Sequence, residues 1–94
     1  MASVRNLKKD IAFLVREVIL DTQLFIYMHP KKNTETAYSI IEDAIDMFNA
    51  LYARANHPDG KDNPKLIKAH YNSIRKDLKE QTHKLFIRIS DLTN

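Results

Sequence analysis

Four histidines are the side chains in this 94-residue chain most suited to binding a metal ion. They stand at positions 29, 57, 70 and 83, so no two have the i, i+4 spacing of a helical two-histidine site. His57 could approach His70, and His29 could approach His83, if the helices predicted below run antiparallel. His29 and His57 then fall at opposite ends, about 36 Å or more apart. We interpret all four as loop or surface histidines and expect no metal and no cofactor.

The segment from Asp59 to Asn63 places carboxylates around Gly60, which is the only glycine in the chain. An EF-hand calcium loop needs alternating oxygen ligands before its glycine and a glutamate at its end, and this segment has neither. We interpret it as a turn followed by a helix cap. A single glycine also excludes a glycine-rich phosphate loop, and the absence of cysteine excludes thiolate chemistry. Because we find no pairing of a nucleophile with a base, we expect that the protein is not an enzyme.

A buried polar layer is a better candidate for a site. Thr22 interrupts the apolar stripe of the first predicted helix roughly 27 Å from its start, and Gln81 and Thr82 interrupt that of the third at roughly 26 Å. Asp21 flanks Thr22, and Tyr38 of the second helix is expected near the same level. In one interpretation the layer sets the register of the helices. In the other it forms a small pocket for a polar ligand, with Asp21 as the anchor.

Surplus apolar residues are the strongest indication of function. On the first predicted helix, four of them follow an i, i+7, i+11, i+14 spacing on the side away from the main stripe: Phe13, Leu20, Leu24 and Tyr27. Phe86 and Ile87 leave the stripe of the third helix, at the expected level of Tyr27. Exposed apolar patches of this kind mark surfaces for a partner protein or for self-association. The alternative is that the first helix is simply the most buried, wrapped by the other two.

The helix-breaking residues indicate which elements position these side chains. All of them fall in two short segments, 29–33 and 57–64, which leave three uninterrupted helical stretches. We expect helices at about 3–28, 34–56 and 64–92. Connections this short join antiparallel neighbours, so the sequence predicts an all-α fold, an elongated up-down-up antiparallel three-helix bundle that forms a single domain over the whole chain.

The predicted helix ends have suitable residues. Ser3 is a good N-cap for the first helix, and Pro30 ends that helix because proline disfavours helical geometry in the residue before it. Asn33 or Thr34 can cap the second helix. The pair Asn63-Pro64 is the strongest start signal, since it places a preferred cap before a proline at the first helical position.

Each predicted helix has an apolar stripe with three-four spacing, which is expected to face the core. In the first helix the stripe consists of Val4, Leu7, Ile11, Leu14, Val18, Phe25 and Met28. In the second it consists of Ala37, Ile40, Ile41, Ala44, Phe48, Leu51, Tyr52 and Ala55. In the third it consists of Ile67, Tyr71, Ile74, Leu78, Leu85, Ile89 and Leu92.

The charges are unevenly spread, because residues 33–56 are net acidic and residues 64–94 are net basic. An acidic helix beside a basic one favours pairing of antiparallel neighbours. A nucleic-acid-binding regulator that uses the basic third helix is the alternative. Asp77, Glu80 and Asp91 interrupt its basic residues, and its length exceeds that of a helix-turn-helix unit, so we do not expect a nucleic-acid partner.

Two features of the sequence bear on the cellular compartment of the protein. The first ten residues are polar and contain no apolar run that could act as a secretion signal. No continuous apolar run, Leu24–Met28 included, approaches the roughly 20 residues that span a bilayer. Together with the absence of cysteine, these features lead us to expect a cytoplasmic protein without a membrane span.

Two stretches carry a resemblance to known proteins. They are Val4–Ile11, with the apolar run that ends at His29-Pro30, and Asp59–Tyr71. In these stretches the chain resembles small bacterial helical-bundle proteins of the kind found in Bacteroidetes, which have no assigned activity. The resemblance implies a helical bundle and a bacterial origin. Bacteriocin immunity proteins share the size and architecture only. We expect a non-enzymatic protein-interaction module, homodimeric through the first helix, with an immunity-protein-like bundle as an alternative.

Overall fold

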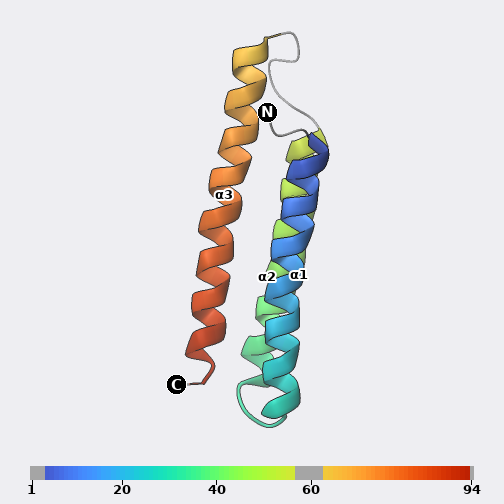
Figure 1. The fold of residues 1–94 in the computed structure, drawn as a ribbon. Helices are drawn as coiled ribbons and strands as arrows, with labels where there is room; N and C mark the ends of the chain where they lie inside the picture. The colour runs from blue at the N-terminus through green and yellow to red at the C-terminus, as the bar shows by residue number, and fades with distance from the viewer. Residues whose placement is uncertain (1–3, 57–62, 94) are drawn as a thin grey trace.

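The computed structural model of this protein describes residues 4–56 and 63–93 of the chain. It contains three helices, α1 (Val4–Met28), α2 (Thr34–Asn56) and α3 (Pro64–Asp91), and no β-strand in the described ranges (Figure 1). The prediction of an all-α three-helix bundle is confirmed.

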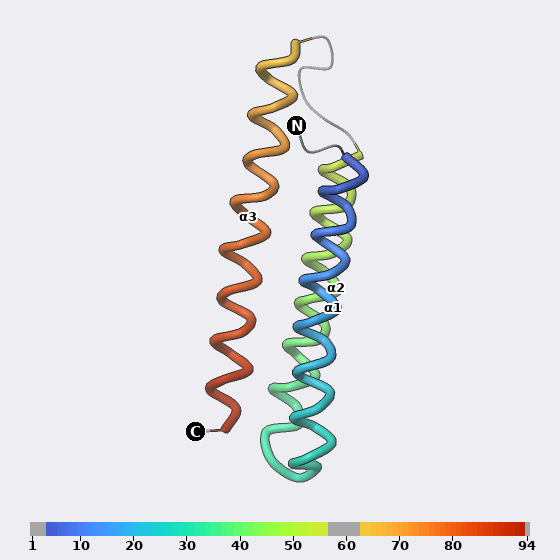
Figure 2. Tube along the Cα trace, in the orientation of Figure 1, coloured from blue at the N-terminus to red at the C-terminus, as the bar shows by residue number. Residues whose placement is uncertain are grey.

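Consecutive helices run antiparallel along one long axis, with α1 and α3 pointing down and α2 pointing up in Figure 2, and each helix contacts the other two. The molecule measures 53 × 19 × 18 Å, so the bundle is elongated as expected. α1 contacts α2 more extensively than it contacts α3. α1 therefore shares its largest helix–helix contact with α2.

The helix ends differ in how they are capped. Asn63 caps α3 as predicted, because its Oδ1 accepts hydrogen bonds from the backbone amides of Lys65 (3.0 Å) and Leu66 (3.3 Å). Asn33 precedes α2 with a φ of 53°, and its side chain bonds the end of α3 instead of capping α2. The predicted cap at Ser3 lies outside the described residues.

The core is one continuous apolar cluster with members from all three helices. Its buried apolar residues are Leu7, Ile11, Val15, Val18, Phe25, Ala37, Ile40, Ala44, Met47, Leu51, Ala55, Ile74, Leu78, Leu85 and Leu92. Most were predicted from the stripes, but Val15 and Met47 were missed. Met28 was predicted to be buried and is 63% exposed, because it lies on the flank of the stripe in the last turn of α1.

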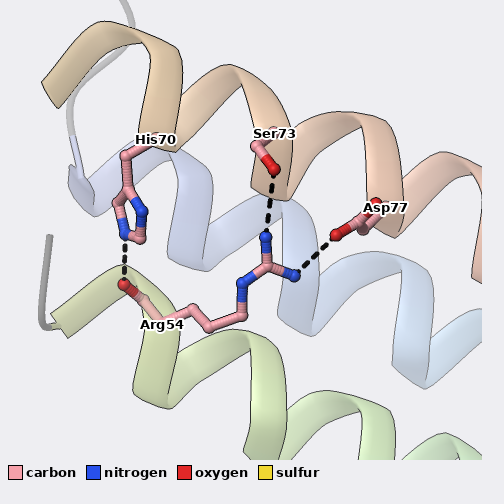
Figure 3. Close-up of polar contacts among 4 residues, drawn as sticks. All are labelled: Arg54, His70, Ser73 and Asp77. Carbon is pink, nitrogen blue, oxygen red and sulfur yellow. Dashed lines mark hydrogen bonds and ion pairs between the residues drawn. The ribbon is translucent and has the colours of Figure 1, made fainter. Parts of the chain in front are cut away.

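Among residues 4–56 and 63–93, three ion pairs join the helices at the surface. Arg88 pairs with Asp43 (2.7 Å), which is the pairing expected between basic α3 and acidic α2. Arg75 pairs with Asp10 of α1 (2.9 Å). The third pair, described with Figure 3 below, has the opposite polarity, with its cation on α2.

The helices α1 and α3 do not start at the same level. Arg75 pairs with Asp10, and Leu14 and Leu78 line the same groove. A residue of α3 therefore lies beside the residue of α1 whose number is about 65 lower. Level starts would give a difference of about 60, the separation of the two first residues. α3 therefore begins about five residues further out, roughly 7 Å. The first turns of α3 accordingly project beyond the start of α1 (Figures 1 and 2).

Candidate functional site

An exposed apolar row runs along α1 on the side opposite its buried residues. Phe13 and Leu20 are each 51% exposed, Leu24 is 57% exposed and Tyr27 is 84% exposed. We call these four residues the α1 ridge. At 3.6 residues per turn they share one face of the helix, while Leu7, Ile11, Val18 and Phe25 occupy the other. The alternative expectation, that these residues are apolar because α1 is the most buried helix and is wrapped by the other two, is wrong for this face, since all four residues are exposed.

Phe86 and Ile87 do not extend the α1 ridge. Phe86 is partly buried and packs against the core, whereas Ile87 is 46% exposed. The prediction that they lie level with Tyr27 is wrong. Because α3 is shifted along the bundle axis, residues near Leu92 lie at the level of Tyr27 instead. The apolar surface is thus concentrated on α1.

Three shallow grooves border α1 in the described part of the chain. The groove between α1 and α2 has a volume of about 290 Å³, and its lining is almost entirely apolar: Ala12, Val15, Arg16, Ile19, Leu20, Ile45 and Phe48. A second groove, of about 490 Å³, is basic and lies beside Tyr52, with Lys8 5.6 Å above the ring of that tyrosine. The third, of about 210 Å³, lies between α1 and α3 and includes Phe13. The α1 ridge therefore has a groove on each flank.

The predicted buried polar layer reduces to two threonines. Thr22 and Thr82 are buried, but Asp21, Tyr38 and Gln81 are exposed. The two threonines are also not level, because the shift of α3 separates them by about five residues along the bundle axis. Thr22 and Thr82 consequently do not bond each other.

Each threonine is satisfied inside its own helix. The Thr22 hydroxyl donates to the carbonyl oxygen of Val18 (2.7 Å), and the Thr82 hydroxyl donates to that of Leu78. Among the described residues, no buried side-chain polar atom lacks a hydrogen-bond partner. A pocket anchored by Asp21 is not formed, because that carboxylate lies on the surface.

Sequence reasoning missed the cluster of polar side chains where the end of α2 meets α3 (Figure 3). Nη1 of Arg54 donates to the Asp77 carboxylate (2.7 Å), and its Nη2 donates to the Ser73 hydroxyl (3.2 Å). Nε2 of His70 lies 2.7 Å from the backbone carbonyl oxygen of Arg54. The sequence did contain an indication of this cluster. Residues 70, 73 and 77 share one face of α3, and Arg54 is the only cation of α2.

This cluster joins helices and has no catalytic arrangement. A serine, a histidine and an aspartate lie close together, but His70 contacts neither Ser73 nor Asp77 in Figure 3. Both of those side chains bond the Arg54 guanidinium. The carbonyl that His70 bonds is one of the last four of α2, which have no partner within the helix. We therefore assign the cluster to the attachment of α3 to α2.

The remaining histidines have separate surroundings. The ring of His29 lies 4.8 Å from that of Phe25, and His83 is exposed on α3. His57 lies outside the described residues, so its approach to His70 stays a prediction. Within residues 4–56 and 63–93, no three potential ligands among His, Cys, Asp and Glu gather where they could hold a metal ion.

None of the three helices, over the ranges that the structure describes, combines the length and apolar character needed to cross a bilayer. No protein-family model, curated protein or solved structure matches this chain in comparisons with all three. Function is therefore inferred from the α1 ridge and its surroundings.

Proposed function

We propose that this protein is a non-enzymatic protein-interaction module that self-associates as a homodimer through the α1 ridge. The observation that carries the proposal is the exposure of the α1 ridge, where all four large apolar side chains are at least half exposed. Single exposed apolar residues are normal on protein surfaces, but a row of four on one helix face is typical of an interface.

The surroundings of the α1 ridge support the same proposal. Beside Leu20, the groove between α1 and α2 adds Ile45, which is 46% exposed, and the partly buried Phe48. An interface centred on the α1 ridge could extend into this groove and bury apolar surface from two helices. Burial of apolar surface is the main favourable term in association.

The alternative of nucleic-acid binding by α3 has less support. Two of its cations, Arg75 and Arg88, pair with carboxylates of the neighbouring helices. Those two charges contribute to bundle assembly and are less available to phosphates.

Sedimentation velocity over roughly 1–500 µM tests the proposal, because a small interface predicts association in the micromolar range. We expect the wild type to dimerise reversibly and the double variant Phe13→Glu/Leu20→Glu to remain monomeric with unchanged helix content. The control is Ile87→Glu, which places a glutamate at an exposed apolar position of α3 and should dimerise like the wild type.

Two results would overturn the proposal. One is a wild type that stays monomeric over the whole range. The other is a dimer that survives the double substitution on the α1 ridge, because its interface would then lie elsewhere on the surface.

A further inference from the structure

The α1 ridge is bordered by charges of opposite sign on its two edges. Arg16 lies roughly 50° from the centre of the ridge on the side toward α2, at 100° per residue. Glu17 lies roughly 50° away on the side toward α3, and Asp21 follows it one turn later. Lys9 extends the basic edge toward the start of the helix. Each edge of the α1 ridge therefore carries charge of one sign.

The carboxylates of Glu17 and Asp21 and the guanidinium of Arg16 have no ion-pair partner in the part of the chain that the structure describes. Asp10, by contrast, pairs with Arg75. Glu17 and Asp21 also have the i, i+4 spacing at which like charges repel on a helix. A cation supplied from outside the chain would relieve that repulsion.

The arrangement of the edges distinguishes the two ways in which two α1 helices can pair face to face. With the two helices parallel, a two-fold axis along them brings the basic edge of one copy against the acidic edge of the other. With the helices antiparallel, each edge meets its own copy, so that basic faces basic and acidic faces acidic. Opposite charges flanking an apolar seam are the usual determinant of helix orientation in such pairs.

We infer that the α1 ridge binds the α1 ridge of a second copy of this chain, with the two α1 helices parallel. Arg16 of each copy then faces Glu17 and Asp21 of the other. This inference rests on the proposed self-association and specifies its geometry. Phe13, Leu20 and Tyr27 are spaced by seven residues, which is the period of a helical seam. In the parallel pair each of them meets its own counterpart.

The length of the α1 ridge sets the expected affinity. The ridge spans 14 residue steps, roughly 21 Å at 1.5 Å per residue. We expect a contact of this length to bury less area than a standard stable interface. The dimer should therefore be weak, and its charged edges should contribute a substantial share of its specificity.

Charge substitutions on the two edges test the orientation. Arg16→Glu reverses the charge that faces Glu17 and Asp21 of the other copy, and we expect it to raise the dissociation constant about tenfold or more. The triple variant Arg16→Glu/Glu17→Arg/Asp21→Arg exchanges the charges at these three positions and should restore dimerisation to near the wild-type level. Arg16 and Asp21 are exposed and Glu17 is partly exposed, so circular dichroism should show unchanged folding.

A disulfide provides a second measurement, because the chain has no cysteine of its own. In the parallel pair, two copies of Tyr27→Cys face each other and should cross-link rapidly under mild oxidation. In an antiparallel pair centred near Leu20, the same positions lie roughly 20 Å apart and should not. Ile87→Cys, on α3, is the matched control and should cross-link only slowly.

The outcomes separate this inference from the proposed function. A dimer that Arg16→Glu leaves unchanged and that Tyr27→Cys does not cross-link overturns the parallel arrangement but preserves self-association. A wild type that stays monomeric at all concentrations overturns both. Loss of dimerisation in Arg16→Glu, recovery in the triple variant and cross-linking at position 27 together support the parallel pair.

Discussion

The side-chain amide of Asn33 donates a 2.9 Å hydrogen bond to the carbonyl oxygen of Leu92, 59 positions later in the sequence. The bond joins the turn between α1 and α2 to the end of α3. Asn33 has a φ of 53°, in the left-handed region that asparagine tolerates better than most residues. The Leu92 carbonyl lies at the end of α3, where carbonyls lack partners within the helix. Asn33 therefore serves both the turn and the docking of α3.

Substitution of Asn33 should separate these two roles. Asn33→Gly keeps the left-handed backbone and loses the hydrogen bond, so we expect a loss of about 1 kcal/mol in unfolding free energy. Asn33→Ala also keeps a Cβ in that region without the polar side chain that lets asparagine tolerate it, so we expect about 2 kcal/mol. Urea denaturation measures both. Lys32→Ala, which removes an exposed contact with Thr93, is the control at under about 0.5 kcal/mol. Equal losses for the Gly and Ala variants would contradict the role of the backbone.

The buried Thr22 should contribute through its methyl group more than through its hydroxyl. The Val18 carbonyl that its hydroxyl bonds also accepts a backbone amide in a helix, so Thr22→Val leaves no unpaired group. We expect a change below about 0.5 kcal/mol for Thr22→Val. Thr22→Ser keeps the hydroxyl but removes a buried methyl and should cost about 1 kcal/mol. Thermal unfolding of both variants checks the order, and a larger loss for Val would restore a structural role for the hydroxyl.

Two methionines provide a matched test of which faces are buried. Met47 is 6% exposed and Met28 is 63% exposed. We expect Met47→Ala to lower the unfolding free energy by about 2–3 kcal/mol, because it removes a buried side chain and leaves a cavity. Met28→Ala should cost less than about 0.5 kcal/mol. Chemical denaturation of the two variants compares the same substitution at both positions, and similar losses would contradict the described core.

Arg54 should contribute more than Arg75 to the attachment of α3. It holds both Asp77 and Ser73 of α3, whereas Arg75 bonds Asp10 alone. We expect Arg54→Met, which keeps the apolar stem, to cost about 1 kcal/mol and Arg75→Met to cost less. The difference should shrink in 1 M salt, because these pairs are partly exposed and are screened. An Arg54→Met loss no larger than that of Arg75→Met would contradict this order.

The sequence by itself determined the three helices and most of their buried residues. Two segments hold all the strong helix-breaking residues, and apolar residues recur at three-four spacing between them, so local chemistry sets where helices begin and end. Asn63 before Pro64 is an example, since its cap forms as predicted. The exposure of Phe13, Leu20, Leu24 and Tyr27 was also accessible from sequence, because the period of a helix separates the two faces of α1.

Only the tertiary structure decided how far α3 is shifted along α1. Sequence reasoning aligned the starts of the two helices, which placed Thr22 level with Thr82 and Tyr27 level with Phe86. The observed shift of about five residues separates both pairs. The physical reason is that the axial position of a helix depends on contacts between residues far apart in the chain, such as Arg75 with Asp10 and Asn33 with Leu92. Local propensity and periodicity contain no information about those contacts.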